Sequence, residues 1–111
     1  MFVKWKISMS KKLVKDLKEN DICFFVYDDG VASIVNCDSI KKSNIGLDIE
    51  YYDVTFIARN NGAILEYSCN GECDFIMGDD HVIYLNKVDA LEQIEYVIKE
   101  CNTSKELINE Y

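Results

Sequence analysis

The chain has 111 residues, a formal net charge of −8 and an apolar fraction of 49%. This length predicts a single domain over residues 1–111, and the apolar content excludes an intrinsically disordered chain. No apolar run approaches the roughly 20 residues that a membrane span needs, and residues 1–20 lack the apolar core of a secretory signal. We therefore expect a cytoplasmic protein with no membrane partner.

The charge is divided unevenly along the chain. Residues 1–18 carry six lysines and one aspartate, a net charge of +5, whereas residues 19–111 carry −13. Direct binding of nucleic acid by the acidic part is not expected, because phosphate contacts need cations. A basic protein surface is the partner that this charge favours, although a high net charge also serves solubility alone. The five cysteines are an odd number, which favours free thiols over a disulfide framework.

Residues 1–20 are predicted to form a basic strand and helix. Apolar and lysine side chains alternate over residues 2–8, which is typical of a strand. Ser10 can cap a short helix over residues 11–19, with Leu13, Val14 and Leu17 as its apolar stripe.

Residues 21–86 are predicted to form an antiparallel sheet. Residues 22–27 are apolar on both faces, which indicates a central strand. Asp29-Gly30 predicts a two-residue hairpin turn that places Phe25 opposite Ile34, with a return strand over residues 31–37. Residues 38–47 are polar and could be a long loop or the continuation of a bent strand.

The next segment, residues 51–77, contains two further turn signals. Asn61-Gly62 and Asn70-Gly71 each predict a two-residue type I′ turn, and the first places Ala58 opposite Leu65. Period-two alternation then gives an apolar face, which we expect to pack against the helix side chains Leu91, Ile94 and Ile98. That face comprises Tyr52, Val54, Phe56, Ala58, Leu65, Tyr67 and Cys69.

The rest of the chain predicts a turn, a strand and two helices. Gly78-Asp79-Asp80 reads as a turn before a strand over residues 81–85. Asn86 is a suitable cap for a long helix over residues 87–101, and Thr103-Ser104 for a short one over 105–111. The expected buried stripe of the long helix is Val88, Leu91, Ile94, Ile98 and Cys101, and the short helix is expected to dock through Leu107, Ile108 and Tyr111. The predicted fold is therefore α+β: a curved antiparallel sheet of five or six strands with a short N-terminal helix and C-terminal helices over residues 87–111.

Two segments of the sequence carry a family resemblance. KENDICFFVYDDG at residues 18–30 and VIYLNKVDALEQI at residues 82–94 resemble small uncharacterised bacterial and phage proteins. In those proteins an SH3-like (Tudor-like) barrel is followed by a C-terminal helix. The resemblance implies a small barrel in the present chain and implies no catalytic residue.

The sequence offers little chemistry. Cys69, Cys73 and His81 form the one metal-like set, but a zinc site usually has four ligands arranged as paired knuckles. A type I′ turn at Asn70-Gly71 would also place Cys69 and Cys73 on opposite faces of the hairpin. A Cys–His nucleophile needs a third, orienting group that the spacing does not supply. We expect no catalytic residue, no metal and no cofactor, and thus a protein that is not an enzyme.

Interleaved tyrosines and carboxylates point to protein binding, because tyrosine supplies contact area while carboxylates attract lysine or arginine. The sequence predicts a non-enzymatic inhibitor, of the phage anti-defence (anti-CRISPR) or toxin-immunity type, that occludes a basic nucleic-acid-binding or active-site surface. The alternative is a nucleic-acid-associated SH3-like module that uses Lys11, Lys12, Lys15 and Lys18. The candidate partner-binding residues are Asp48, Glu50, Tyr51, Asp53, Glu66, Asp74, Asp79, Asp80, Glu92, Glu95 and Tyr96.

Overall fold

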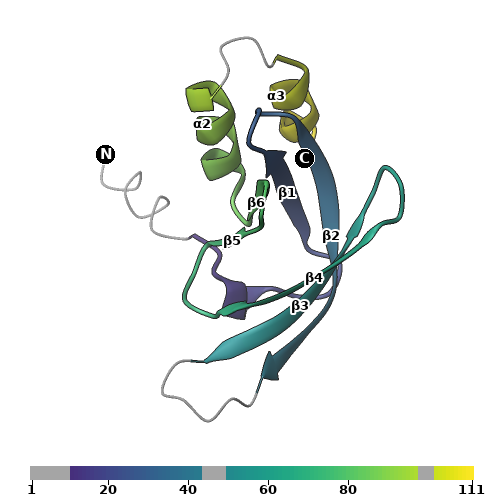
Figure 1. Cartoon of the computed structure of the whole chain (residues 1–111), viewed down its shortest axis with the longest axis vertical. Helices are drawn as coiled ribbons and strands as arrows, with labels where there is room; N and C mark the ends of the chain where they lie inside the picture. Colours follow the sequence, from purple (N-terminus) through teal and green to yellow (C-terminus); the bar gives the residue numbers. More distant parts are fainter. Residues whose placement is uncertain (1–10, 44–49, 98–101) are drawn as a thin grey trace.

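The computed structural model describes residues 11–43, 50–97 and 102–111, and it is an α+β fold (Figure 1). Six strands form one antiparallel sheet in the order β4-β3-β2-β1-β6-β5, which places β4 and β5 at its two edges. The elements are η1 (Val14–Asp16), β1 (Ile22–Tyr27), β2 (Ala32–Ser43), β3 (Tyr51–Ala58), β4 (Ile64–Asn70), β5 (Phe75–Met77), β6 (His81–Tyr84), α2 (Lys87–Val97) and α3 (Asn102–Asn109).

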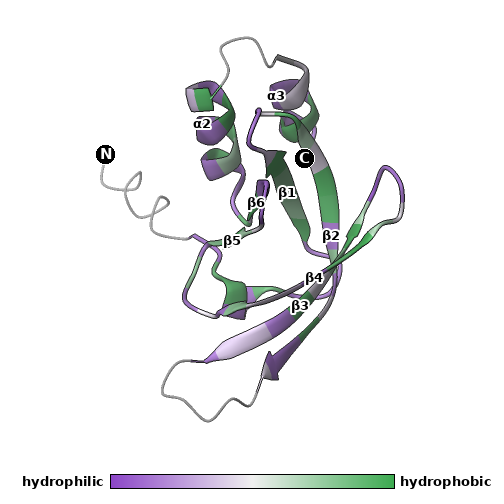
Figure 2. Cartoon of the chain, in the orientation of Figure 1, coloured by the Kyte–Doolittle hydropathy of each residue, from purple (hydrophilic) through white to green (hydrophobic). Residues whose placement is uncertain are grey.

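The sheet curls into a nearly closed, barrel-like shape that encloses one core and carries a second core outside. The inner core, inside the curl, contains Cys23, Phe25, Val35, Phe56 and Ile83 among its buried residues. The helix core lies between the outer face of the sheet and helices α2 and α3, which lie side by side over β1 and β2 (Figure 1). Figure 2 shows the matching hydropathy, with apolar residues along β1 and polar residues at the far end of β2.

Strand β1 contributes to both cores, as its two apolar faces predict. Cys23 and Phe25 point into the inner core, whereas Phe24 and Val26 lie under the helices. The predicted pairing of Phe25 with Ile34 is wrong by one residue, because Phe25 lies opposite Ser33. The turn has three residues, closed by a Tyr27 N–H to Val31 carbonyl bond, and Gly30 takes a positive φ of 91°.

The β3–β4 hairpin has the predicted faces with a different register. Phe56 lies opposite Leu65, so the pairing is shifted by two residues from the predicted one, and a two-residue shift keeps every side chain on its face. The loop has four residues, with Gly62 at a φ of +73°. The apolar face packs into the inner core, so the prediction that it meets the α2 side chains is wrong.

Asn70-Gly71 does not form the predicted second hairpin, because β4 and β5 lie at opposite edges of the sheet. The turn instead runs from Asn70 to Cys73, whose N–H donates to the Asn70 carbonyl over 3.2 Å. A Cβ atom at Gly71 would lie 2.6 Å from the ring of Tyr52, so glycine allows this ring to pack closely.

The predicted helix over residues 11–19 is wrong, since only the single 3-10 turn η1 forms there. Tertiary hydrogen bonds replace helical ones: the N–H groups of Val14 and Lys15 donate to the carbonyls of Cys73 and Gly71. Val14 and Leu17 are buried in the inner core, which two extended flanks position better than a helix. The strand predicted over residues 2–8 lies outside the described residues.

Residues 38–47 were predicted to be either a long loop or the continuation of a bent strand, and the first part of this segment is strand. The strand continues to Ser43, with an irregularity between Cys37 and Ser39 that is typical of a bulge. Residues 44–49, which include Asp48, lie outside the described residues.

Helix α2 begins at Lys87 as predicted, and its described part ends at Val97. Its buried side chains are Ala90 and Ile94, with Leu91 packed against them, whereas Val88 is exposed against prediction. The predicted stripe residues Ile98 and Cys101 lie outside the described residues.

Helix α3 starts earlier and ends earlier than predicted, and it buries Ile108 in the helix core. Tyr111, expected to dock, is 43% exposed and packs on Arg59, whose guanidinium lies 5.1 Å from the ring centre. None of the helices in the described residues is long and apolar enough to cross a membrane.

Candidate functional site: an acidic and aromatic groove

A groove lies beside α2, where the helix passes the edge strand β5 and its neighbour β6. It has a volume of about 440 Å³. We call it the acidic groove, and its lining residues are Lys11, Asp74, Phe75, Tyr84, Asp89, Glu92, Gln93 and Tyr96. The α2 residues among them lie at positions 89, 92, 93 and 96, a spacing that places side chains on one face of a helix.

Aromatic side chains supply much of the groove's apolar surface. Tyr96 is 88% exposed and Phe75 is 38% exposed, so both are accessible to a partner. Tyr84 is half-buried, and burial, with a smaller effect from the nearby Asp89, raises the pKa of its phenol. Exposed aromatic rings are enriched in surfaces that bind proteins.

The groove already holds one ammonium group. The Nζ atom of Lys11 lies 3.0 Å from Asp89 and 3.5 Å from Asp74. The hydrogen bond from Lys11 to Asp89 raises the pKa of the lysine. Glu92 forms no ion pair with any described residue, so the groove retains a net negative charge after Lys11 is counted.

Two more predicted residues lie in a second groove, which is located near the β4 edge of the sheet. Asp53 and Glu66 line it together with Lys41, Thr55 and Ser68, which come from β2, β3 and β4. Lys41 lies directly opposite Asp53 in the β2–β3 register, so this groove is less acidic than the first.

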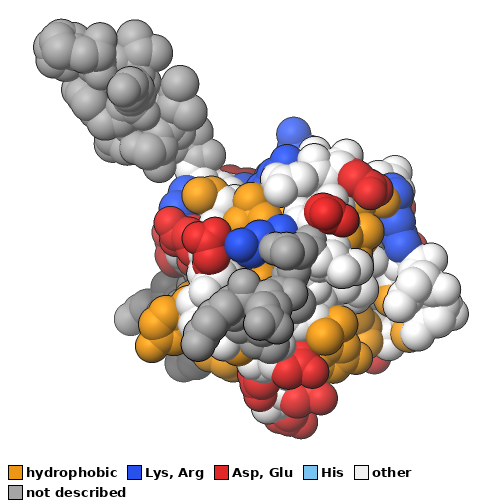
Figure 3. Space-filling model, turned by 90° about the horizontal axis from the view of Figure 1, so that it is seen from above, with side chains coloured by type: hydrophobic (Ala, Val, Ile, Leu, Met, Phe, Trp, Pro, Cys, Tyr) orange, Lys and Arg blue, Asp and Glu red, His pale blue; other side chains and the backbone are white. Residues whose placement is uncertain are grey.

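The remaining candidates are dispersed. Glu50 pairs with Lys42 at 2.8 Å, which lowers the pKa of its carboxyl, and Glu95 pairs with Lys105 at 3.3 Å on the side of α2 that faces α3. Asp79 and Asp80 are exposed in the β5–β6 turn, and Tyr51 is half-buried. On the face that Figure 3 shows, acidic side chains lie in separate groups with basic ones between them.

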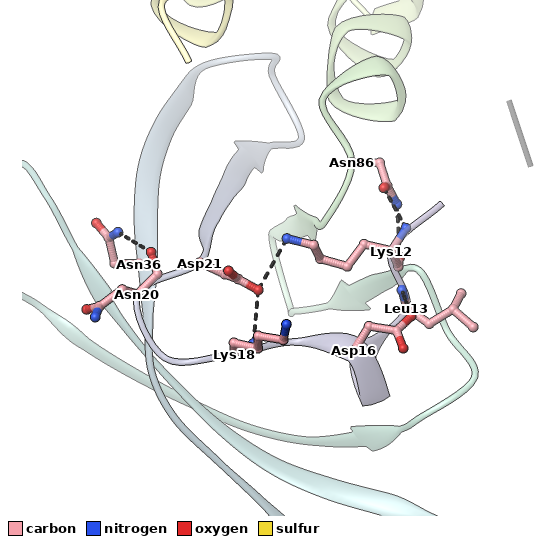
Figure 4. A network of polar contacts seen from close by, with 8 residues as sticks. All are labelled: Lys12, Leu13, Asp16, Lys18, Asn20, Asp21, Asn36 and Asn86. Atoms are coloured by element: carbon pink, nitrogen blue, oxygen red, sulfur yellow. Dashed lines mark hydrogen bonds and ion pairs between the residues drawn. The ribbon is translucent and has the colours of Figure 1, made fainter. Parts of the chain in front are cut away.

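Three of the four lysines proposed for nucleic-acid contact are paired within the chain. Besides Lys11, the Nζ of Lys12 lies 3.2 Å from Asp21 and that of Lys15 lies 2.8 Å from Glu72. Figure 4 shows how Lys12 is held: the Asn86 side chain accepts from its N–H and donates to its carbonyl. These contacts fix the segment against the domain.

The cysteine and histidine residues are engaged in structure. Cys69 and Cys73 both pack against the inner core, rather than on opposite faces of a hairpin as predicted. The His81 ring contacts Tyr67 Oη at 2.7 Å and Asp80 Oδ1 at 2.8 Å, so both of its nitrogens have partners. Burial raises the pKa of Cys69 to about 11, which disfavours a nucleophilic thiolate. The described residues contain no group of three or more potential ligands placed to hold a metal.

The structure thus brings together Asp74, Glu92 and Tyr96 of the predicted set and adds others that the sequence reasoning did not select. Phe75, Tyr84, Asp89 and Gln93 complete the groove. The α2 members share a helical spacing that the sequence contains, but their meeting with β5 depends on the sheet order.

Comparisons with protein-family models, with curated proteins and with solved structures find no match to this chain.

Proposed function

We propose that this chain is a non-enzymatic protein-binding module whose acidic groove binds a basic surface of a partner protein. The observation that carries the proposal is the pairing of Lys11 with Asp89 and Asp74, because it demonstrates that the groove accommodates an ammonium group. Glu92 and Tyr96 remain available beside that pair for a second cation and its apolar stem.

The physical basis is electrostatic attraction followed by contact with aromatic side chains. The net charge of −8 accelerates encounter with a basic surface, and complementary charges set the orientation. Exposed Tyr96 and Phe75 then supply the contact area that concentrates binding energy in few residues. Occlusion of a nucleic-acid-binding or active-site surface, as by an anti-CRISPR or immunity protein, is the biological role we assign.

The internal ion pairs of Lys11, Lys12 and Lys15 favour this proposal over the nucleic-acid alternative. Each of these lysines already has a carboxylate partner within 3.2 Å. A phosphate would have to displace that partner, so the expected affinity for nucleic acid is low.

The test compares two carboxylates of the same helix. We expect Glu92→Gln to weaken binding of poly-L-lysine and of basic nucleases by about tenfold at low salt, because it removes the unpaired groove carboxylate. Glu95→Gln is the matched control, since Glu95 faces Lys105 outside the groove. Isothermal titration calorimetry measures both, with affinity falling as ionic strength rises. Equal effects of the two substitutions, or no binding of any basic probe, would refute the proposal.

A further inference from the structure

Strand β5 is an edge strand with unused hydrogen-bonding groups. Among the described residues β5 pairs with β6 alone, and in that pairing Asp74, Ile76 and Gly78 carry the main-chain bonds. The Leu85 N–H donates to the Asp74 carbonyl, and the Gly78 N–H donates to the His81 carbonyl. Antiparallel strands bond through alternate residues. The N–H and C=O groups of Phe75 and Met77 therefore point away from β6.

These outward groups have no hydrogen-bond partner within residues 11–43, 50–97 and 102–111. The neighbouring N-terminal segment bonds to Gly71 and Cys73 and stops short of the strand itself. An edge of this kind is a template for another strand.

The two faces beside this edge differ in chemistry. Phe75 and Met77 are 38% and 67% exposed on the groove side, whereas Ile76 between them is buried in the inner core. The acidic groove flanks one end of β5 through Asp74 and Glu92, and the turn residues Asp79 and Asp80 flank the other. A strand added here would meet negative charge on one face and apolar surface on the other.

We infer that β5 binds an extended partner segment in which Lys or Arg alternates with apolar residues, added antiparallel as a seventh strand. Its basic side chains lie on the groove side beside Phe75 and Glu92, and its apolar side chains extend the inner core beside Ile76. This inference rests on the proposed function and specifies the class of partner. Charge complementarity selects β5 over the β4 edge, because the acidic groove holds three carboxylates against Lys11, whereas the groove near β4 holds two against Lys41.

The experiment uses an alternating Lys-Val peptide with blocked ends, titrated into the full chain at low salt. In an antiparallel addition the residues opposite Phe75 and Met77 share their face and direct their own N–H groups toward β5. N-methylation of the Lys amides removes those donors without changing charge, and we expect binding to weaken about tenfold or more. N-methylation of the Val amides, which point away, should leave the affinity unchanged.

A protein variant tests the same contact from the other side. Met77→Pro removes an outward N–H that β6 does not use, so the sheet should persist while peptide binding falls. Ile64→Pro is the matched control, because Ile64 occupies the equivalent outward position in the other edge strand, β4, and is as exposed as Met77. Circular dichroism verifies that both variants fold. If one of them does not fold, the comparison of the two N-methylated peptides still tests the inference.

The outcomes separate the inference from the proposed function. Equal binding of the unmodified and both methylated peptides would overturn strand addition and leave groove binding intact. Failure of the peptide where poly-L-lysine binds through Glu92 would do the same, whereas failure of every basic probe would overturn both.

Discussion

The inner core and the helix core use opposite faces of the same strands but are closed in different ways. All six strands contribute to the inner core, and Val14 and Leu17 complete it from a segment far away in the sequence. In the described residues the helix core is built from β1, β2, the β6 residue Tyr84 and the two C-terminal helices. The inner core therefore depends on long-range contacts throughout the domain, and the helix core is a smaller layer added to it.

This difference matters for the candidate site because the acidic groove lies at the junction of the two layers. Phe75 and Asp74 are positioned by the strands around the inner core, whereas Glu92 and Tyr96 are positioned by a helix that the helix core holds. Binding should consequently depend on both layers, and stability mainly on the inner one.

The largest effect is expected from Phe56→Ala, which removes a fully buried ring from the inner core. Such substitutions lower the free energy of unfolding by about 3–5 kcal/mol, and Ile94→Ala in the helix core by about 2–5 kcal/mol. Urea unfolding followed by circular dichroism should show sheet and helix lost together in Phe56→Ala. In Ile94→Ala the helical signal should be lost first. If Ile94→Ala destabilises the sheet as much as Phe56→Ala does, the helix core is not a separate layer added to the inner core.

Alkaline pH should weaken the inner core next. Burial raises the pKa of Cys23 from 9.0 to about 12 and that of Cys37 to about 11. Above pH 9 the unfolded chain releases these protons while the folded chain keeps them, so stability falls as pH rises. Between pH 9 and its pKa in the folded state, each thiol lowers the free energy of unfolding by about 1.4 kcal/mol per pH unit. Thermal unfolding between pH 7 and pH 10 measures the loss, and a Cys23→Ala, Cys37→Ala variant should lose less stability with pH.

The smallest effect is expected from Asn86→Ala at the junction itself. This substitution removes two hydrogen bonds to the main chain of Lys12, and we expect the free energy of unfolding to fall by about 1–3 kcal/mol. Asn60→Ala, in an exposed loop, is the control and should change stability by about 0.5 kcal/mol or less. Equal losses for both would show that Asn86 does not join the layers.

The sequence predicted side-chain faces better than it predicted pairings. Alternation around Val54 and Phe56 fixed their burial because a shift of two residues does not change faces. Asp29-Gly30 led to an error of one residue, since the turn holds three residues rather than two. The strand register depends on the number of residues in the turn, and an Asx-Gly pair does not determine that number.

Contacts between segments that are distant in the chain could not be predicted from the sequence. The segment around Val14 has a helical pattern, yet hydrogen bonds to Gly71 and Cys73 override it. For the same reason half of the acidic groove was missed: Tyr96 was selected for its exposure, whereas Phe75 joins it only because β5 lies at the sheet edge beside α2.

The contact between Lys12 and Asn86 spans 74 positions of the chain. During synthesis Val14 and Leu17 leave the ribosome long before β5 and β6, whose Ile76 and Ile83 share the inner core with them. The barrel cannot close before β5 and β6 have emerged, and until that point the apolar side chains of the preceding strands remain exposed to solvent. Nascent chains of this protein should therefore acquire protease resistance late and in one step, only after residue 86 has emerged.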